Sequence, residues 1–170
     1  NWFYDRSLDS GLELKATCAP QYYRIVRQRR AEARRQGEEV APLMTGHPHH
    51  SGHPTAMNQM TRGCLAASGV CFISHRGSVQ PCGYLPLEAG NLKRQSFREV
   101  WEHSDLFASM RDLNNLEGKC GCCEFKQVCM GCRARSFGMT GNYQGEEPFC
   151  LYEPRAMRGD LRENKQSIPH

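Results

Sequence analysis

Long apolar runs are missing from this chain of 170 residues. No stretch approaches the ~18 apolar residues that a membrane-spanning helix needs. The first five residues, Asn1–Asp5, also lack the basic region followed by an apolar run that marks a secretory signal peptide, so we expect none. Because only 39% of the residues are hydrophobic, we expect bound metal to replace much of the missing apolar core.

Cysteine, by contrast, is abundant, with ten residues in the chain. Two environments produce such counts, namely secreted disulfide scaffolds and intracellular metal proteins. Nine of the ten cysteines fall between Cys64 and Cys150, at spacings that are typical of metal ligands. We therefore predict metal-bound thiolates and a cytoplasmic location.

The cysteine spacing defines a compact motif. Cys120, Cys123, Cys129 and Cys132 form C-x2-C-x5-C-x2-C. Cys64, Cys71 and Cys82 lie upstream, and Cys150 follows. Four thiolates match the preference of zinc or of an iron–sulfur cluster, and spacing alone does not separate one structural zinc site, or two, from iron–sulfur clusters.

The segment before this domain is basic. Residues 11–18 alternate apolar and polar side chains and predict a short strand, and residues 21–36 predict a helix between Pro20 and Gly37. The helix carries several arginines, among them Arg24, Arg27 and Arg30. They indicate a solvated helix face or a site for substrate carboxylates; nucleic acid is a weaker interpretation, because no aromatic platform accompanies the charge.

A linker rich in histidine, proline and glycine follows at residues 38–57. Its histidines, between His47 and His53, either bind metal or belong to a polar connection. Residues 71–82 predict a β-hairpin with its turn at Arg76-Gly77, which places Cys71 and Cys82 at the same open end.

Residues 96–113 predict helix with an apolar, partly aromatic face that belongs to the core. Ser96 and Glu99 match a capping box, and a second start at Ser104-Asp105 indicates two short helices with a kink. The glycines that follow, including Gly118, permit tight turns around cysteine ligands.

The order C-x6-C-x5-G-x4-C, C-x2-C-x5-C-x2-C and a lone cysteine resembles the SPASM domain, the auxiliary-cluster domain at the C-terminus of many radical S-adenosylmethionine (SAM) enzymes. The usual third segment is C-x2-C-x5-C-x3-C, so this chain is one residue shorter there. Segments such as Thr61–Cys64, Gly77–Tyr84 and Gly131–Arg135 resemble the tetrapyrrole-tailoring branch of the family, in particular its haem-synthesising members.

The resemblance implies two interleaved [4Fe–4S] clusters. One would be held by Cys64, Cys71, Cys82 and Cys132, and the other by Cys120, Cys123, Cys129 and Cys150. Cys122 is extra and is interpreted as a bystander, or as a replacement for Cys123.

The resemblance also implies a reaction, the oxidative decarboxylation of propionates to vinyl groups on an iron tetrapyrrole, with one cluster exchanging an electron with an external donor or acceptor. However, no trio of cysteines here has the C-x3-C-x2-C spacing that holds the catalytic cluster and SAM. We therefore expect an enzyme domain that is inactive alone, whose SAM and further [4Fe–4S] cluster lie in a missing N-terminal part.

The predicted fold is α+β: a small cysteine-rich domain with a β-hairpin, short helices and Gly-rich loops around the clusters, preceded by the end of a truncated partial α/β barrel. Residues 1–37 would be the barrel remnant, 38–57 the linker, 58–155 the SPASM-like domain and 156–170 a flexible tail.

Cys18, at the end of the expected barrel strand, is a candidate substrate contact together with Arg24, Arg27 and Arg30, although a buried inert cysteine is the other interpretation. We expect no nucleic-acid or membrane partner. Two functional alternatives stay open, an auxiliary domain of a peptide-modifying radical SAM enzyme and a non-enzymatic zinc-binding module.

Overall fold

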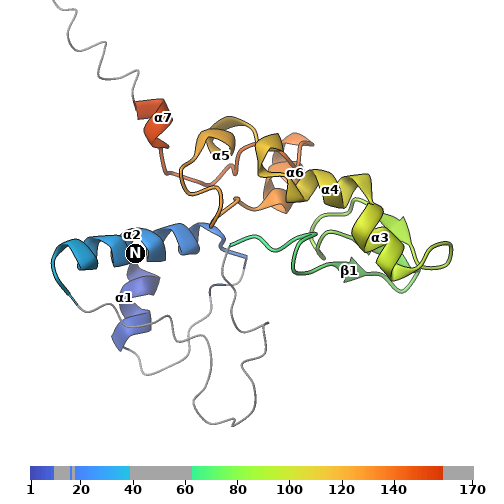
Figure 1. Cartoon of the computed structure of the whole chain (residues 1–170), viewed down its shortest axis with the longest axis horizontal. Coiled ribbons are helices and arrows are strands. Elements are labelled where there is room, and N and C mark those ends of the chain that lie inside the picture. Colours follow the sequence, from blue (N-terminus) through green and yellow to red (C-terminus); the bar gives the residue numbers. More distant parts are fainter. Residues whose placement is uncertain (10–15, 17, 39–62, 159–170) are drawn as a thin grey trace, which may run out of the picture.

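The computed structural model describes residues 1–9, 16, 18–38 and 63–158. Figure 1 shows an elongated arrangement in which β1 and α3 lie at one end, α1 and α2 lie toward the other, and α5 and α6 lie between them. The elements are small, and cysteine-bearing loops connect them. The chain thus combines short helices with a small sheet, as predicted for an α+β protein.

Two helices form the N-terminal part. Helix α2 (Gln21–Arg35) follows Pro20 and confirms the helix predicted from the sequence. Helix α1 (Trp2–Asp9) was not predicted; it packs on α2 through the rings of Phe3 and Tyr22, whose centroids are 5.1 Å apart, and through an ion pair between Arg29 and Asp5. The predicted strand at 11–18 lies outside the described residues except for Ala16 and Cys18, and the partial barrel stays a prediction.

The predicted hairpin is present. Strand β1 (Phe72–Ile73) pairs antiparallel with β2 (Ser78–Gln80), with Phe72 opposite Gln80 and Ile73 opposite Val79. Gly77, in the turn, has φ +81°, a left-handed conformation that glycine adopts without steric cost. The hairpin therefore brings the chain back on itself between Cys71 and Cys82.

A third strand, β3 (Gly90–Asn91), pairs with β2 and gives the order β1-β2-β3. This strand was not predicted, because glycine and asparagine are depleted in strands. Gly90 is required by packing: a Cβ atom there would lie 2.6 Å from Cγ2 of Val100. The sheet and the first helix of the following pair are thus in close contact.

The helical region 96–113 divides as predicted. Helix α3 (Phe97–His103) begins after Ser96, whose hydroxyl accepts a hydrogen bond from the Glu99 amide at 3.2 Å. Helix α4 (Asp105–Arg111) begins after Ser104, and a 3-10 turn, η2 (Leu113–Asn115), follows. The N-terminal cap at Ser96 and the kink are confirmed.

The main core lies between the sheet and these helices. Its buried members are Ala66, Ala67, Val79, Leu85, Val100, Phe107 and Met110. Phe107 is fully buried, as expected for the aromatic face, and Trp101 is half-buried against it. Phe97 differs from the prediction: it is 43% exposed, and its ring contacts that of Trp101, with the two centroids 5.8 Å apart.

Three short helices complete the structure, α5 (Gly118–Cys122), α6 (Arg133–Thr140) and α7 (Arg155–Arg158). Helix α7 includes the first residues of the segment predicted to be a flexible tail, so these residues are helical. Residues 159–170 lie outside the described part, as does the histidine-rich linker from residue 39 onward. None of the helices in the described residues is long and apolar enough to cross a membrane.

Candidate metal centre

Backbone hydrogen bonds connect the two cysteine-rich stretches of the domain. The amide of Gly63 donates to the Val128 carbonyl at 2.7 Å, and the amide of Cys64 donates to the Cys129 carbonyl at 3.3 Å. A Cβ atom on Gly63 would lie 2.7 Å from the Cys129 carbonyl and 2.6 Å from Pro20. This close approach places the start of the domain against its second cysteine motif and against the N-terminal end of α2.

Cys64, Cys82 and Cys132 form a first group of thiols. Burial raises the pKa of Cys82, and the neighbouring Cys64 and Cys132 raise it further. Cys71 directly precedes β1, and burial raises its pKa as well. Cys64, Cys71 and Cys82 all pack against the main core. The chain thus gathers residues that are far apart in sequence.

Cys120, Cys123, Cys129 and Cys150 form a second group. Burial raises the pKa of Cys129 to about 11, and the neighbouring Cys120 and Cys150 raise it too. Burial is also the largest cause of the raised pKa of Cys123, on which the same two thiols act. Such mutual repulsion among thiolates disfavours four negative charges without a compensating cation. The chemistry of this group therefore fits a bound metal or metal cluster.

A left-handed turn separates Cys129 from Cys132. Met130 and Gly131 have φ +62° and +66°, and Met130 is 1% exposed. A non-glycine residue in this conformation costs about 1–3 kcal/mol. Packing of Met130 in a second core cluster with Leu113 and Leu116 offsets this strain. The turn directs the two cysteines toward different groups.

The second group also receives hydrogen bonds at sulfur. Arg133 donates from Nη2 to Cys120 Sγ at 3.4 Å, and the Glu147 amide donates to the same sulfur at 3.4 Å. The Phe125 amide donates to Cys123 Sγ at 3.4 Å. Hydrogen bonds from N–H groups stabilise negative charge on sulfur and tune a cluster that the sulfur holds.

Cys122 is placed differently from its neighbour Cys123. Its side chain is exposed and its thiol donates to the Lys119 carbonyl at 3.7 Å. This position is consistent with the interpretation of Cys122 as a bystander.

The donor chemistry of these two groups fits iron–sulfur clusters. A Cβ atom on Gly131 would lie 3.0 Å from Cys120 Sγ and 2.5 Å from Arg133 Nη2, so only glycine leaves room at this sulfur. In the part of the chain that the structure describes, no three His, Cys, Asp or Glu side chains are close enough to hold a single metal ion. A cluster spreads its thiolates around a larger body than one ion, so the interactions between thiols are the relevant observation.

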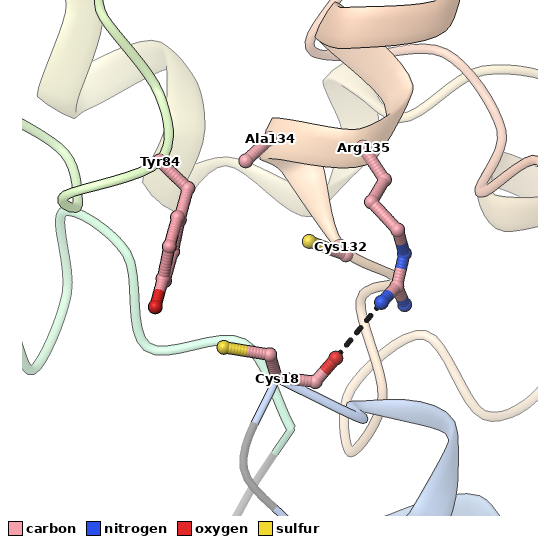
Figure 2. A pocket seen from close by; sticks show the side chains of 5 residues that line it. All are labelled: Cys18, Tyr84, Cys132, Ala134 and Arg135. Atoms are coloured by element: carbon pink, nitrogen blue, oxygen red, sulfur yellow. Dashed lines mark hydrogen bonds between the residues drawn. The ribbon is translucent and has the colours of Figure 1, made fainter.

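A pocket of about 400 Å³ adjoins the first group (Figure 2). Its lining residues are Cys18, Tyr84, Cys132, Ala134 and Arg135. The Arg135 guanidinium donates to the Cys18 carbonyl at 2.9 Å and to the Glu147 carboxylate at 2.7 Å. Figure 2 shows Tyr84 and the sulfurs of Cys18 and Cys132 around one open space.

Among the residues predicted to contact substrate, the structure brings Cys18 alone to this pocket. Cys18 is exposed and has φ +55°, so it is not the buried cysteine of the alternative interpretation. Arg24 lies over the Tyr152 ring, 4.5 Å from its centroid, Arg27 is exposed and Arg30 is half-buried. None of these arginines lines the pocket.

Sequence reasoning missed the roles of Tyr84, Arg133, Arg135 and Glu147. The arginines lie in the segment Gly131–Arg135 that carried the family resemblance, but nothing in the sequence says which of the two is buried. Glu147, 3% exposed, gave no signal at all, because its partner Arg135 is twelve positions away in the chain.

Comparison with known proteins identifies the domain. Residues 64–133 match the SPASM family, an iron–sulfur cluster-binding domain. The chain is 47% identical over 154 residues to an AdoMet-dependent heme synthase of Methanosarcina barkeri, which covers 91% of the chain and 40% of that protein. It is 49% identical over 157 residues to the AdoMet-dependent heme synthase of Nitratidesulfovibrio vulgaris, covering 92% and 39%.

A more distant relative has a different name. A PqqA peptide cyclase of Methylocella silvestris is 29% identical over 113 residues, which covers 62% of the chain and 28% of that protein.

The chain spans about 40% of the length of the heme synthases that it matches. It carries a SPASM-type iron–sulfur domain, as predicted.

Proposed function

We propose that this chain, which carries a SPASM-type iron–sulfur domain, is part of a radical SAM enzyme of haem biosynthesis. In that enzyme it serves as the electron-transfer and substrate-side domain. The similarity to heme synthases over more than nine-tenths of the chain supports this proposal. The relatives are enzymes by name, and a domain that binds iron–sulfur clusters supplies single-electron transfer when loaded.

The observation that carries the proposal is the grouping of the thiols. Cys82 interacts with Cys64 and Cys132, whereas Cys129 interacts with Cys120 and Cys150. We assign two [4Fe–4S] clusters to these groups. The first is held by Cys64, Cys71, Cys82 and Cys132, and the second by Cys120, Cys123, Cys129 and Cys150.

The proposed substrate is an iron tetrapyrrole with propionate side chains. The whole enzyme would transfer a hydrogen atom from a propionate to a radical derived from SAM; carbon dioxide then leaves, a vinyl group forms, and one electron leaves the substrate. The electron passes to an external partner. SAM and its own cluster would be bound outside this chain, which has no C-x3-C-x2-C spacing.

The pocket beside Cys132 is the proposed substrate side of the domain. The Tyr84 side chain is 74% exposed and offers an aromatic face to a planar ring, and Cys18 borders the same space. Arg135 supplies the positive charge that lines this pocket. From the sequence, this role of contacting substrate carboxylates had been predicted for Arg24, Arg27 and Arg30. The chain contributes the wall of the pocket that lies next to the first proposed cluster.

A second candidate function is peptide modification. The similarity to a PqqA peptide cyclase supports it, but this similarity covers 62% of the chain against 91% for the heme synthase of Methanosarcina barkeri. A zinc-binding module without activity is the third candidate.

We place the enzyme in the cytoplasm, since four-thiolate iron sites need a reducing compartment. We propose no nucleic-acid or membrane partner for it.

Metal analysis tests the proposal. The chain is reconstituted with iron and sulfide in the absence of oxygen, and iron, sulfide and zinc are measured. About eight irons per chain support both clusters, and about four support one. Zinc without sulfide would overturn the redox assignment. Cys122→Ala serves as the matched control, because its exposed side chain should leave the iron content unchanged.

Titration of the full-length enzyme with an iron porphyrin separates the two enzymatic candidates. Absorbance changes that saturate at one porphyrin per chain, at a concentration near that of the protein, support the tetrapyrrole substrate. Saturable binding of a peptide in place of the porphyrin would support the peptide-modifying alternative.

A further inference from the structure

Arg133, the first residue of α6, is a buried cation, 2% exposed. Its Nη1 donates to the carbonyls of Tyr143 at 3.0 Å and Gly145 at 2.7 Å. These neutral acceptors fix the plane of the guanidinium without neutralising its charge. In the described part of the chain, no carboxylate lies within ion-pair distance of Arg133.

A buried charge without a counter-charge is strongly unfavourable. The one acidic group that Arg133 reaches is the thiol of Cys120, to which Nη2 donates at 3.4 Å. As a thiolate, Cys120 supplies the missing negative charge. The neighbouring arginine, Arg135, supports this assignment by contrast. It already has a counter-charge, because the Glu147 carboxylate is its ion-pair partner at 2.7 Å.

The contact between Arg133 and Cys120 depends on the turn before α6. Gly131 packs so closely that a Cβ atom would lie 2.5 Å from Nη2 of Arg133 and 3.0 Å from Cys120 Sγ. The amide of Glu147 donates to the same sulfur at 3.4 Å from the other segment. Two donors from separate parts of the chain thus converge on one sulfur.

We propose that Arg133 is the counter-charge of the cluster held by Cys120, Cys123, Cys129 and Cys150, and that it raises the reduction potential of this cluster. The inference rests on the proposed function, which assigns a cluster to these thiols. Reduction adds one negative charge to the cluster, and a fixed positive charge in a low-dielectric interior stabilises the reduced state more than the oxidised state. Arg133 acts through Cys120 and is therefore a positioning residue.

The direct test is a redox titration of the full-length reconstituted enzyme, followed by electron paramagnetic resonance so that each cluster is observed separately. Arg133→Gln should lower the midpoint potential of one auxiliary cluster, with about a tenfold change in the reduction equilibrium, or about 59 mV for one electron. Arg133→Lys keeps the charge and should shift the potential less. The other clusters should keep theirs.

Arg111 provides the matched controls, Arg111→Gln and Arg111→Lys. It is a half-buried arginine of α4 that donates to the Ala67 carbonyl at 2.8 Å and stacks on Trp101. These variants should leave every potential unchanged. An unchanged potential in Arg133→Gln, at wild-type iron content, overturns the inference.

A measurement on the wild-type enzyme covers the case in which both Arg133 variants fail to load iron. Protein labelled with ¹⁵N in its arginine side chains should show a ¹⁵N hyperfine coupling in the pulsed resonance spectrum of one reduced auxiliary cluster. Its absence overturns the inference, whereas failure of the wild-type enzyme to bind iron and sulfide overturns the proposed function instead.

Discussion

Arg135 and Glu147 form an ion pair in which the carboxylate is almost completely buried. The Nε atom of Arg135 donates to Oε1 of Glu147 at 2.7 Å, and the Glu147 side chain is 1% exposed while that of Arg135 is 29% exposed. The same guanidinium donates to the Cys18 carbonyl at 2.9 Å. The pair therefore joins α6 both to the loop before Cys150 and to the segment before α2.

Removal of Arg135 should destabilise the protein strongly. Arg135→Ala leaves the Glu147 carboxylate buried without a counter-charge, and the expected loss in the free energy of unfolding is about 3 kcal/mol. Anaerobic urea denaturation followed by circular dichroism measures the loss. Arg98→Ala is the control, because its pair with Glu102 lies on the surface of α3 and is worth less than about 1 kcal/mol. Equal losses in the two variants would contradict the prediction.

Two glycine variants should have opposite effects. Gly131→Ala places a methyl group against Cys120 Sγ at a residue with φ +66°, so we expect loss of the second group's iron and lower stability. Gly138→Ala lies in the interior of α6, where nothing is within 4 Å of the added methyl, and should stabilise the protein by about 0.5–1 kcal/mol. Iron content and thermal unfolding check both; retention of full iron in Gly131→Ala would refute the packing assigned to that sulfur.

Cys122 and Cys123 are adjacent but should respond differently to substitution. Cys123→Ala should remove about four irons per chain and unfold its surroundings, because ligand binding and folding are coupled in small metal domains. Cys122→Ala should keep its iron, since its thiol is exposed and donates to the Lys119 carbonyl. If the iron is lost from the Cys122 variant and kept in the Cys123 variant, the two assignments must be exchanged.

Tyr152 should hold α2 against the cysteine domain. Its ring lies under the Arg24 guanidinium at 4.5 Å, and its hydroxyl donates to Glu124 at 2.5 Å. Tyr152→Leu removes both contacts and should increase hydrogen exchange in α2, whereas Tyr152→Phe keeps the stacking and should increase it less. A cation–π contact of this kind is worth about 0.5–2 kcal/mol. Equal exchange in wild type and Tyr152→Leu would show that other contacts hold the helix.

Local signals in the sequence were sufficient for the hairpin and for the two short helices, because Gly77 and Ser96 each act on their immediate neighbours. The cysteine spacing likewise predicted the family. The sequence patterns could not predict α1, because the stability of this helix depends on its contacts with α2. The buried positions of Arg133 and Glu147 were also out of reach, since they depend on partners brought together only by the folded loops.

The pairing of Gly63 and Cys64 with Val128 and Cys129 has a consequence for how the protein is made. On the proposed ligand sets, a nascent chain on the ribosome exposes Cys64, Cys71 and Cys82 well before their fourth partner, Cys132, has been synthesised. The set of Cys120, Cys123, Cys129 and Cys150 is complete only when Cys150 has been synthesised. By then all four ligands of the Cys64 site are present. Cluster insertion should therefore follow synthesis in a fixed order, with delivery of iron and sulfide to the Cys64 site first and closure of the Cys150 site last.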